Sequence, residues 1–175
     1  MLKETPEVFV LDIDGVLTDG SFYYTEEGKV MKKFGADDND ALSLLRPHCK
    51  IVFVTGDKRG FKISERRILD MKFEIFPVST IKRIDWIKER YDPARVVYMG
   101  DGIFDHYVMK EVGYGIAPAN SDENAKNAAD YVCRRKGGDR AVAEAALHLL
   151  EKFFKPYDPT KLPEDNINDS RDWTV

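Results

Sequence analysis

The sequence has 175 residues and a mass of 20.1 kDa, a size that suits one domain around a single buried core. Its 27 Lys and Arg residues against 31 Asp and Glu give a formal net charge of -4, which excludes the basic excess of a general nucleic-acid-binding surface. No apolar run approaches the roughly 18 residues that a membrane span needs, and no apolar signal segment follows Met1. We therefore expect a cytoplasmic protein that binds neither nucleic acid nor a membrane.

Short apolar runs alternate with helical patterns along the chain. Continuous apolarity is typical of strands that are buried on both faces of a sheet. Such runs predict strands, in chain order, at residues 8–11, 51–54, 73–76, 96–99, 114–117 and 131–132. Helices are predicted after Ser79, with isoleucines at spacing three, after Ser121, and from Asp139 to Phe154. The alternation predicts an α/β, Rossmann-like, three-layer domain with a mostly parallel central sheet.

Two segments depart from this alternation. In residues 20–34, two β-prone runs flank a turn at Gly28, which predicts a β-hairpin flap directly after the first strand. In residues 155–175, prolines and acidic residues prevent periodic burial. We therefore expect one domain over residues 1–154, followed by a mobile tail that carries Trp173.

The motif that points most clearly to chemistry is Asp12-Ile13-Asp14-Gly15, directly after the first predicted strand. Side chains two apart on a strand share a face, and a turn at Gly15 would lift both carboxylates to the open end of the sheet, where ligands of parallel sheets bind. Two such carboxylates repel each other unless a proton, a cation or a basic neighbour intervenes. A hard cation such as Mg²⁺ is the simplest solution; the alternative is a pair of surface acids.

A second acidic motif, Gly100-Asp101-Gly102-Ile103-Phe104-Asp105, follows the strand at 96–99. Glycine permits a tight backbone there, and Asp101 adds a third carboxylate. Asp105 has two candidate roles. It either caps the helix that runs to Val112 or supports the metal site.

Two further positions suit an anion such as phosphate. Thr55 and Gly56 end the middle strand, where a hydroxyl and backbone N–H groups could hold a phosphate oxygen. Lys82 lies near the start of the helix after Ser79, where its ammonium and the helix N-terminus would both attract an anion. Each feature alone is also typical of an ordinary turn or of a solvated helix face. Their order along the chain favours one shared site.

The sequence resembles the haloacid dehalogenase superfamily, whose four motifs match Asp12-x-Asp14, Thr55, Lys82 and Gly100-Asp101-x-x-x-Asp105. The resemblance covers roughly residues 8 to 154. Within this superfamily, the sequence looks like the small capless phosphatases related to 3-deoxy-manno-octulosonate 8-phosphate phosphatase. The hairpin ending at Phe34 and the pair Gly137-Gly138 support this narrower resemblance.

The resemblance implies a role for each matched residue. Asp12 is implied to be the nucleophile that forms an aspartyl-phosphate, and Asp14 the general acid and base. Mg²⁺ is implied to be held by Asp12, Asp14 through its backbone carbonyl, and Asp101. The phosphoryl oxygens are then held by Thr55, Gly56 and Lys82. The implied substrate is a phosphorylated sugar or sugar acid of cell-surface glycan biosynthesis.

Family resemblance also implies a homotetramer in which hairpins pack together and cover neighbouring sites. The intervals from Asp12 to Thr55 and from Thr55 to Lys82 are too short to hold a cap domain. An open site would be wet. We therefore expect a neighbouring subunit's hairpin, or the tail that carries Trp173, to close it.

The sequence departs from the family pattern at three places: Asp37-Asp38-Asn39-Asp40 after the hairpin, Thr55-Gly56-Asp57-Lys58 where Thr-Gly-Arg is usual, and Gly102 in place of a frequent aspartate. The acids around Asp37 predict extra negative charge near an anionic substrate. Two other classes remain open: a non-catalytic oligomerisation or regulatory module beside a cytidylyltransferase, and a phosphoacceptor signalling domain. Retention of both Asp12 and Asp14 favours the phosphatase.

Overall fold

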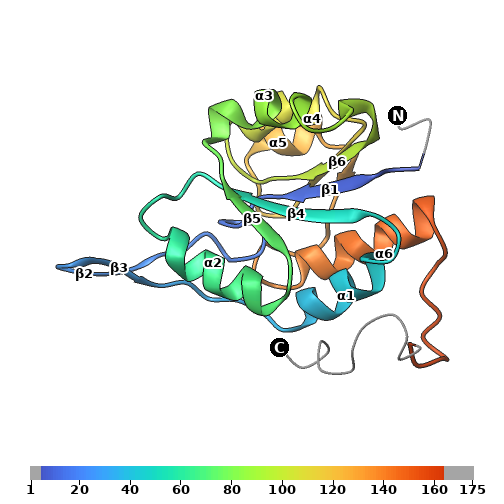
Figure 1. The fold of residues 1–175 in the computed structure, drawn as a ribbon, viewed down its shortest axis with the longest axis horizontal. Helices are drawn as coiled ribbons and strands as arrows, with labels where there is room; N and C mark the ends of the chain where they lie inside the picture. Colours follow the sequence, from blue (N-terminus) through green and yellow to red (C-terminus); the bar gives the residue numbers. More distant parts are fainter. Residues whose placement is uncertain (1–4, 164–175) are drawn as a thin grey trace.

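The computed structural model describes residues 5–163. Within them, six parallel strands form a central sheet in the order β5-β4-β1-β6-β7-β8, and two antiparallel strands form a separate hairpin (Figure 1). The strands are β1 Val8–Leu11, β2 Tyr23–Thr25, β3 Gly28–Met31, β4 Lys50–Thr55, β5 Glu74–Pro77, β6 Val96–Met99, β7 Tyr114–Ala117 and β8 Tyr131–Val132. The predicted α/β class, parallel sheet and hairpin flap are confirmed.

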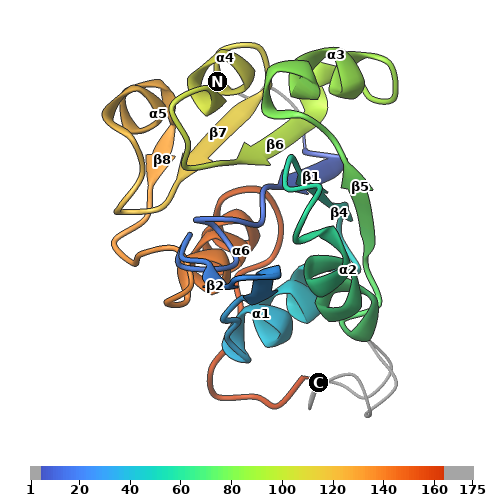
Figure 2. The same ribbon diagram turned by 90° about the vertical axis from the view of Figure 1, so that its left-hand side faces the viewer.

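Helices cover both faces of the central sheet and form the two outer layers of the three-layer fold. α1, α2 and α6 lie on one face, and α3, α4 and α5 lie on the other (Figures 1 and 2). The helices are α1 Asp37–Leu45, α2 Phe61–Asp70, α3 Arg83–Lys88, α4 Asp105–Met109, α5 Glu123–Ala128 and α6 Ala141–Phe153, with short 3-10 turns at Thr80–Lys82 and Pro93–Arg95.

The core divides into two clusters because side chains alternate across the strands. On β1, Phe9 packs in the same cluster as Leu42 of α1, whereas its neighbour Val10 packs with Ile87 of α3. All four side chains are fully buried. Burial of each such side chain stabilises the fold by about 1.5–3 kcal/mol. Because both faces of the sheet are buried, its strands have continuous rather than alternating apolar sequences.

The helix predicted after Ser79 differs from expectation. A 3-10 turn intervenes, and α3 begins only at Arg83. Residues four apart share a helix face, so Arg83 and Ile87 point inward together, and both are buried. Ile81, which the spacing of three placed on the buried face, is 68% exposed.

Helix α6 begins at Ala141, two residues later than the predicted start at Asp139. Arg140, rather than Asp139, precedes the helix, and its φ of 66° is left-handed. The exposed N–H groups of this terminus are satisfied from a distant element, because Ala143 N–H donates to Asp38 Oδ1 of α1 at 2.9 Å. Burial raises the pKa of Asp38 to about 6. Asp38 therefore joins α1 to α6.

The C-terminal segment after α6 forms no helix or strand over residues 155–163, and Trp173 lies outside the described residues. Among the described residues, no helix has both the length and the apolar character that crossing a bilayer requires.

The Asp38 cap yields a stability prediction. Asp38→Ala should lower the free energy of unfolding by about 1 kcal/mol, since the Ala143 N–H loses its acceptor.

Asp38→Asn keeps an acceptor but cannot ionise. Because the folded-state pKa is raised, the wild type should lose stability relative to Asp38→Asn as pH rises from about 4 through about 6. Urea unfolding across this range tests it; a difference that grows in the opposite direction contradicts it.

Candidate active site

Three parallel strands deliver the predicted side chains to one edge of the sheet. β1 lies between β4 and β6, and Leu11 at its end is in register with Phe53 and Met99. Chain order reverses at β1, and such switch points are where ligands of open α/β sheets bind. A cavity of about 320 Å³ opens there, lined by Asp12, Asp14, Gly56, Asp57, Ser79, Thr80, Arg83, Asp101, Gly102, Ile103, Phe104 and Asp105.

The loop after β1 is shaped so that Asp101 can approach it. Gly15 has φ +89°, and a Cβ at this position would overlap the Asp101 carboxylate. Thr18 holds the turn, since its hydroxyl donates to Ile13 O and accepts from Gly15 N–H, each at 3.3 Å. Gly137 packs against the backbone carbonyl of Gly15, where any side chain would collide. These glycines are required by close approach.

Arg83 is the central cation of the site. Its guanidinium donates to both oxygens of Asp12, at 2.7 and 2.8 Å, and to Asp105 at 2.9 Å. Tyr98 donates its hydroxyl to the same Asp105 oxygen at 2.5 Å and accepts from Arg83 at 2.7 Å. A bidentate guanidinium–carboxylate pair fixes direction as well as charge. Arg83 therefore fixes the orientation of Asp12.

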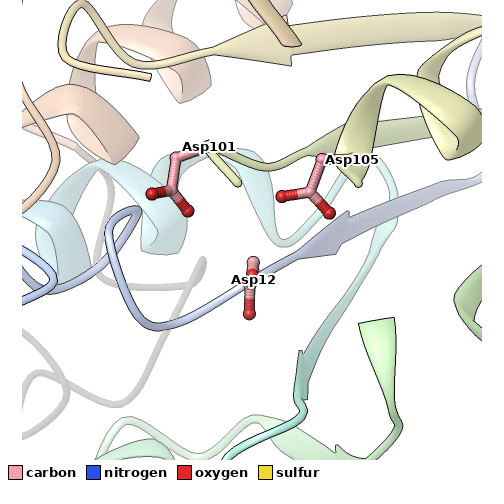
Figure 3. Close-up of side chains that lie close together, drawn as sticks. All are labelled: Asp12, Asp101 and Asp105. Atoms are coloured by element: carbon pink, nitrogen blue, oxygen red, sulfur yellow. The ribbon is translucent and has the colours of Figure 1, made fainter. Parts of the chain in front are cut away.

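The carboxylates of Asp12, Asp101 and Asp105 lie close together at this edge of the sheet (Figure 3). One oxygen from each of Asp12, Asp101 and Asp105 lies within 4.8 Å of the others. Burial raises the pKa of Asp12 to about 6 even though Arg83 opposes the shift. Burial, together with the negative charge of Asp12 and Asp105, raises the pKa of Asp101 to about 8. A set of oxygen ligands with unbalanced negative charge could hold a hard divalent cation.

Asp105 combines parts of both predicted roles. It is the first residue of α4 rather than the residue before it, and its Oδ2 accepts from Gly102 N–H at 2.8 Å. Its other oxygen binds Arg83 and Tyr98. Asp105 thus supports the acidic loop and also supplies a carboxylate to the cluster.

Asp14 and Thr55 meet on the other side of the cavity. The Thr55 hydroxyl donates to Asp14 at 3.4 Å and accepts from Asp57 N–H at 3.1 Å. Lys32, which follows β3 of the hairpin, forms an ion pair with Asp14 at 2.7 Å. No sequence pattern indicated this lysine, because it is brought to the site by tertiary structure alone.

Lys82 does not lie in the site. Its side chain is 70% exposed, and its ammonium faces Asp85 one turn later at 3.5 Å. Arg83 takes the position that was predicted for Lys82. A usable signal existed: Lys82 and Asp85 have the i, i+3 spacing of a surface ion pair, whereas Arg83 is four residues before the apolar Ile87.

The departures from the family pattern fall in different places. Asp37 pairs with Arg140 and lines a second hollow, between α1 and α6, so its charge does not face the active-site cavity as predicted. Asp57 and Gly102 do line the cavity. Although burial opposes the shift, hydrogen bonds from Lys29 and Lys32 lower the pKa of Asp57 to about 2.

Comparison with known proteins agrees with this geometry. Residues 86–145 match the model of the haloacid dehalogenase-like hydrolases. The chain is also 31% identical over 153 residues to a phosphatase of Escherichia coli K12, a match that covers 84% of this chain and 80% of that protein. The chain belongs to the haloacid dehalogenase-like hydrolase family and is a phosphatase.

The Escherichia coli relative is 3-deoxy-D-manno-octulosonate 8-phosphate phosphatase. The phosphatase of that name from Moraxella catarrhalis, solved with magnesium, phosphate and a KDO molecule, superposes with a TM-score of 0.73 at 26% identity and covers 83% of this chain and 86% of its own. A probable phosphatase from Pseudomonas syringae superposes with a TM-score of 0.77 at 28% identity, covering 85% and 86%.

The assignment of Arg83, rather than Lys82, to the active site can be tested directly. Arg83→Met should lower phosphatase turnover on the order of 100-fold, because Asp12 loses its bidentate partner. Arg83→Lys should fall between this variant and the wild type, since it keeps the charge but not the fork geometry. Lys82→Met is the matched control and should change turnover little.

Phosphate release by each variant, with thermal unfolding to verify folding, gives the measurement. Loss of activity in Lys82→Met alongside a folded and active Arg83→Met would reverse the assignment.

Proposed function

We propose that this chain is a Mg²⁺-dependent phosphomonoester hydrolase that acts through an aspartyl-phosphate on Asp12. The observation that carries the proposal is the pair Asp12 and Asp14, which line one cavity but have separate cationic partners, Arg83 and Lys32. Two carboxylates in different electrostatic surroundings suit a nucleophile and a proton-transfer group.

Hydrolysis then takes two steps. An Asp12 oxygen forms a bond to phosphorus while the bond from phosphorus to the leaving oxygen breaks, and Asp14 gives that oxygen a proton. In the second step Asp14 takes a proton from water, the water oxygen bonds to phosphorus, and the Asp12–phosphorus bond breaks. The products are an alcohol and inorganic phosphate, and both carboxyl groups return to their starting states.

The phosphoryl oxygens need donors close to Asp12. Gly56, Thr80 and Arg83 line the cavity, and the Thr55 hydroxyl adjoins Asp14. The Nε of Arg83 is buried and has no hydrogen-bond partner within the described residues, which leaves one edge of the guanidinium for an anion. Arg83 replaces Lys82 as the proposed phosphate-binding cation.

Asp12 and Asp101 would hold the metal ion together with the backbone carbonyl of Asp14, with Asp105 in support. The fit rests on charge, since three carboxylates lie together and the Arg83 guanidinium pairs with two of them, and on the oxygen chemistry that Mg²⁺ prefers. When bound, the ion neutralises negative charge on the phosphoryl group, so that an anionic nucleophile can approach it. The magnesium-bound relative from Moraxella catarrhalis supports this choice of ion.

The proposed substrate is a phosphorylated sugar or sugar acid of cell-surface glycan biosynthesis. The relatives with sequence similarity over most of this chain are named for 3-deoxy-D-manno-octulosonate 8-phosphate, which supports this class. The Asp57 carboxylate lines the cavity, and its ion pairs with Lys29 and Lys32 offset its negative charge.

A phosphate-release screen over sugar phosphates, sugar-acid phosphates and nucleotides tests the function. With Mg²⁺, the wild type should release phosphate from at least one sugar compound, and EDTA should abolish the release. Asp12→Asn should lower turnover by at least about 10⁴-fold, because the nucleophile is lost. Activity that survives this substitution contradicts the proposed nucleophile, and activity that survives EDTA contradicts the proposed metal.

We also propose a homo-oligomer, by family resemblance a tetramer, with the hairpins at its interfaces. The hairpin extends away from the body of the domain (Figure 1). Its exposed apolar side chains are Phe22, Tyr23, Tyr24, Val30 and Met31. Exposed apolar side chains gathered on one hairpin are typical of protein–protein contacts. Ile103 and Phe104, at the cavity, are exposed as well and offer a second apolar surface for a neighbouring hairpin.

Sedimentation velocity tests the assembly. The wild type should sediment as an oligomer, and the double variant Tyr24→Lys with Met31→Lys should shift toward monomer, because two charges would be buried in the interface. Leu69→Lys on α2, which replaces an equally exposed apolar residue away from the hairpin, is the control. A monomeric wild type, or an unchanged oligomer in the double variant, argues against hairpin contacts.

A further inference from the structure

The hairpin carries a lysine into the active site of its own subunit. Lys32 follows β3, and its side chain is fully shielded from solvent at the base of an otherwise exposed flap. Burying an ammonium group is costly unless its charge and its three N–H donors are all satisfied. The position of its partners therefore shows what this lysine holds in place.

Lys32 has three partners, one for each N–H group. Its ammonium lies 2.7 and 3.0 Å from the two oxygens of Asp14, 2.8 Å from Asp57 Oδ2 and 2.9 Å from the hydroxyl of Ser64 in α2. One cation thus joins the hairpin, the strand end of β1, the loop after β4 and α2.

The surroundings leave this ammonium little freedom to move. Lys29 pairs with the same Asp57 oxygen, and the ring of Phe22 lies over both lysines, with its centroid 3.2 Å from the Lys29 ammonium and 5.4 Å from that of Lys32. A Cβ at Gly60 would overlap Asp57 and approach both lysine side chains. Asp57 and Ser64 therefore fix Lys32 independently of Asp14.

We propose that Lys32 is a positioning residue that holds the Asp14 carboxyl toward the leaving-group oxygen and couples the hairpin to catalysis within one subunit. The inference rests on the proposed function, because it takes Asp14 as the proton donor. Lys32 itself transfers no proton. The proton still passes from Asp14 to the leaving oxygen as the bond from phosphorus to that oxygen breaks and the bond to Asp12 forms.

Positioning of a general acid has a signature that a structural role lacks. A poor leaving group needs the proton in the first transition state, whereas a good leaving group departs almost without it. Misplacing Asp14 should therefore slow hydrolysis of phenyl phosphate far more than that of 4-nitrophenyl phosphate. Loss of packing alone would slow both to the same degree.

The experiment compares kcat for these two esters, with Mg²⁺, in the full-length chain. Lys32→Met should lower kcat for phenyl phosphate on the order of 100-fold and for 4-nitrophenyl phosphate by less than about tenfold, with KM for both little changed. Lys29→Met is the matched control, because Lys29 leaves the same hairpin and binds Asp57 but not Asp14; it should lower kcat for both esters by the same small factor. Thermal unfolding verifies that each variant is folded, and Lys32→Gln replaces Lys32→Met if the latter does not fold.

Asp12→Asn and Asp14→Asn, measured in parallel, separate the two levels of the argument. Equal losses for both esters in Lys32→Met or Lys32→Gln, while Asp14→Asn discriminates between them, would overturn the positioning role and leave the proposed function intact. An Asp12→Asn variant that keeps its activity would instead overturn the proposed function. Lys32 variants that retain wild-type kcat for phenyl phosphate would also overturn the positioning role.

Discussion

The charge balance around Arg83 is the constraint on which the site depends. Asp12, Asp101 and Asp105 lie together at the end of a parallel sheet, and one guanidinium binds the two buried members, Asp12 and Asp105, directly. An isolated buried carboxylate would have to take up a proton or be expelled to water. Arg83 opposes this protonation at Asp12, and it comes from α3, on the face of the sheet opposite α1 and α2 (Figure 2).

The remaining architecture serves this convergence. β1 has β4 and β6 as neighbours, so three strands end at one place, and the turn at Gly15 brings Asp101 against the loop that carries Asp12 and Asp14. The packing of Gly137 on Gly15 ties the segment before α6 to the same loop. Glycine is needed at both contacts for lack of space, and at Gly15 also because φ is +89°.

The sequence was informative where local pattern decides the structure. The strands, their parallel arrangement, the hairpin and the acids at strand ends could all be predicted, because burial on two faces and placement at a strand end leave a pattern in neighbouring residues. Whether Lys82 or Arg83 enters the site depends on one 3-10 turn, which rotates every later side chain of the helix. The isoleucine spacing of three favoured the wrong face, whereas the four-residue spacing of Arg83 and Ile87 marks the buried one.

Long-range partners left no such pattern. Asp38 was predicted to add charge near a substrate but accepts a hydrogen bond from the start of α6, and Lys32, which no sequence pattern indicated, is buried against Asp14. In both cases a buried charged group is satisfied by a residue far away in the chain, and only the tertiary fold identifies the partner.

The two carboxylates of the first motif are distinguished by where their cations come from. Asp12 is held by Arg83, a residue of the helical layer, whereas Asp14 is held by Lys32, a residue at the base of the hairpin. Asp57 stands where an arginine is usual in the family pattern. The hairpin residues Lys29 and Lys32 pair with Asp57 and offset its negative charge. Lys29 and Lys32 of the flap therefore complete the charge balance of the site, while Tyr23, Tyr24, Val30 and Met31 of the same hairpin are exposed. A contact that moves the hairpin would also move the ammonium group beside Asp14, because Lys32 directly follows strand β3 of the hairpin.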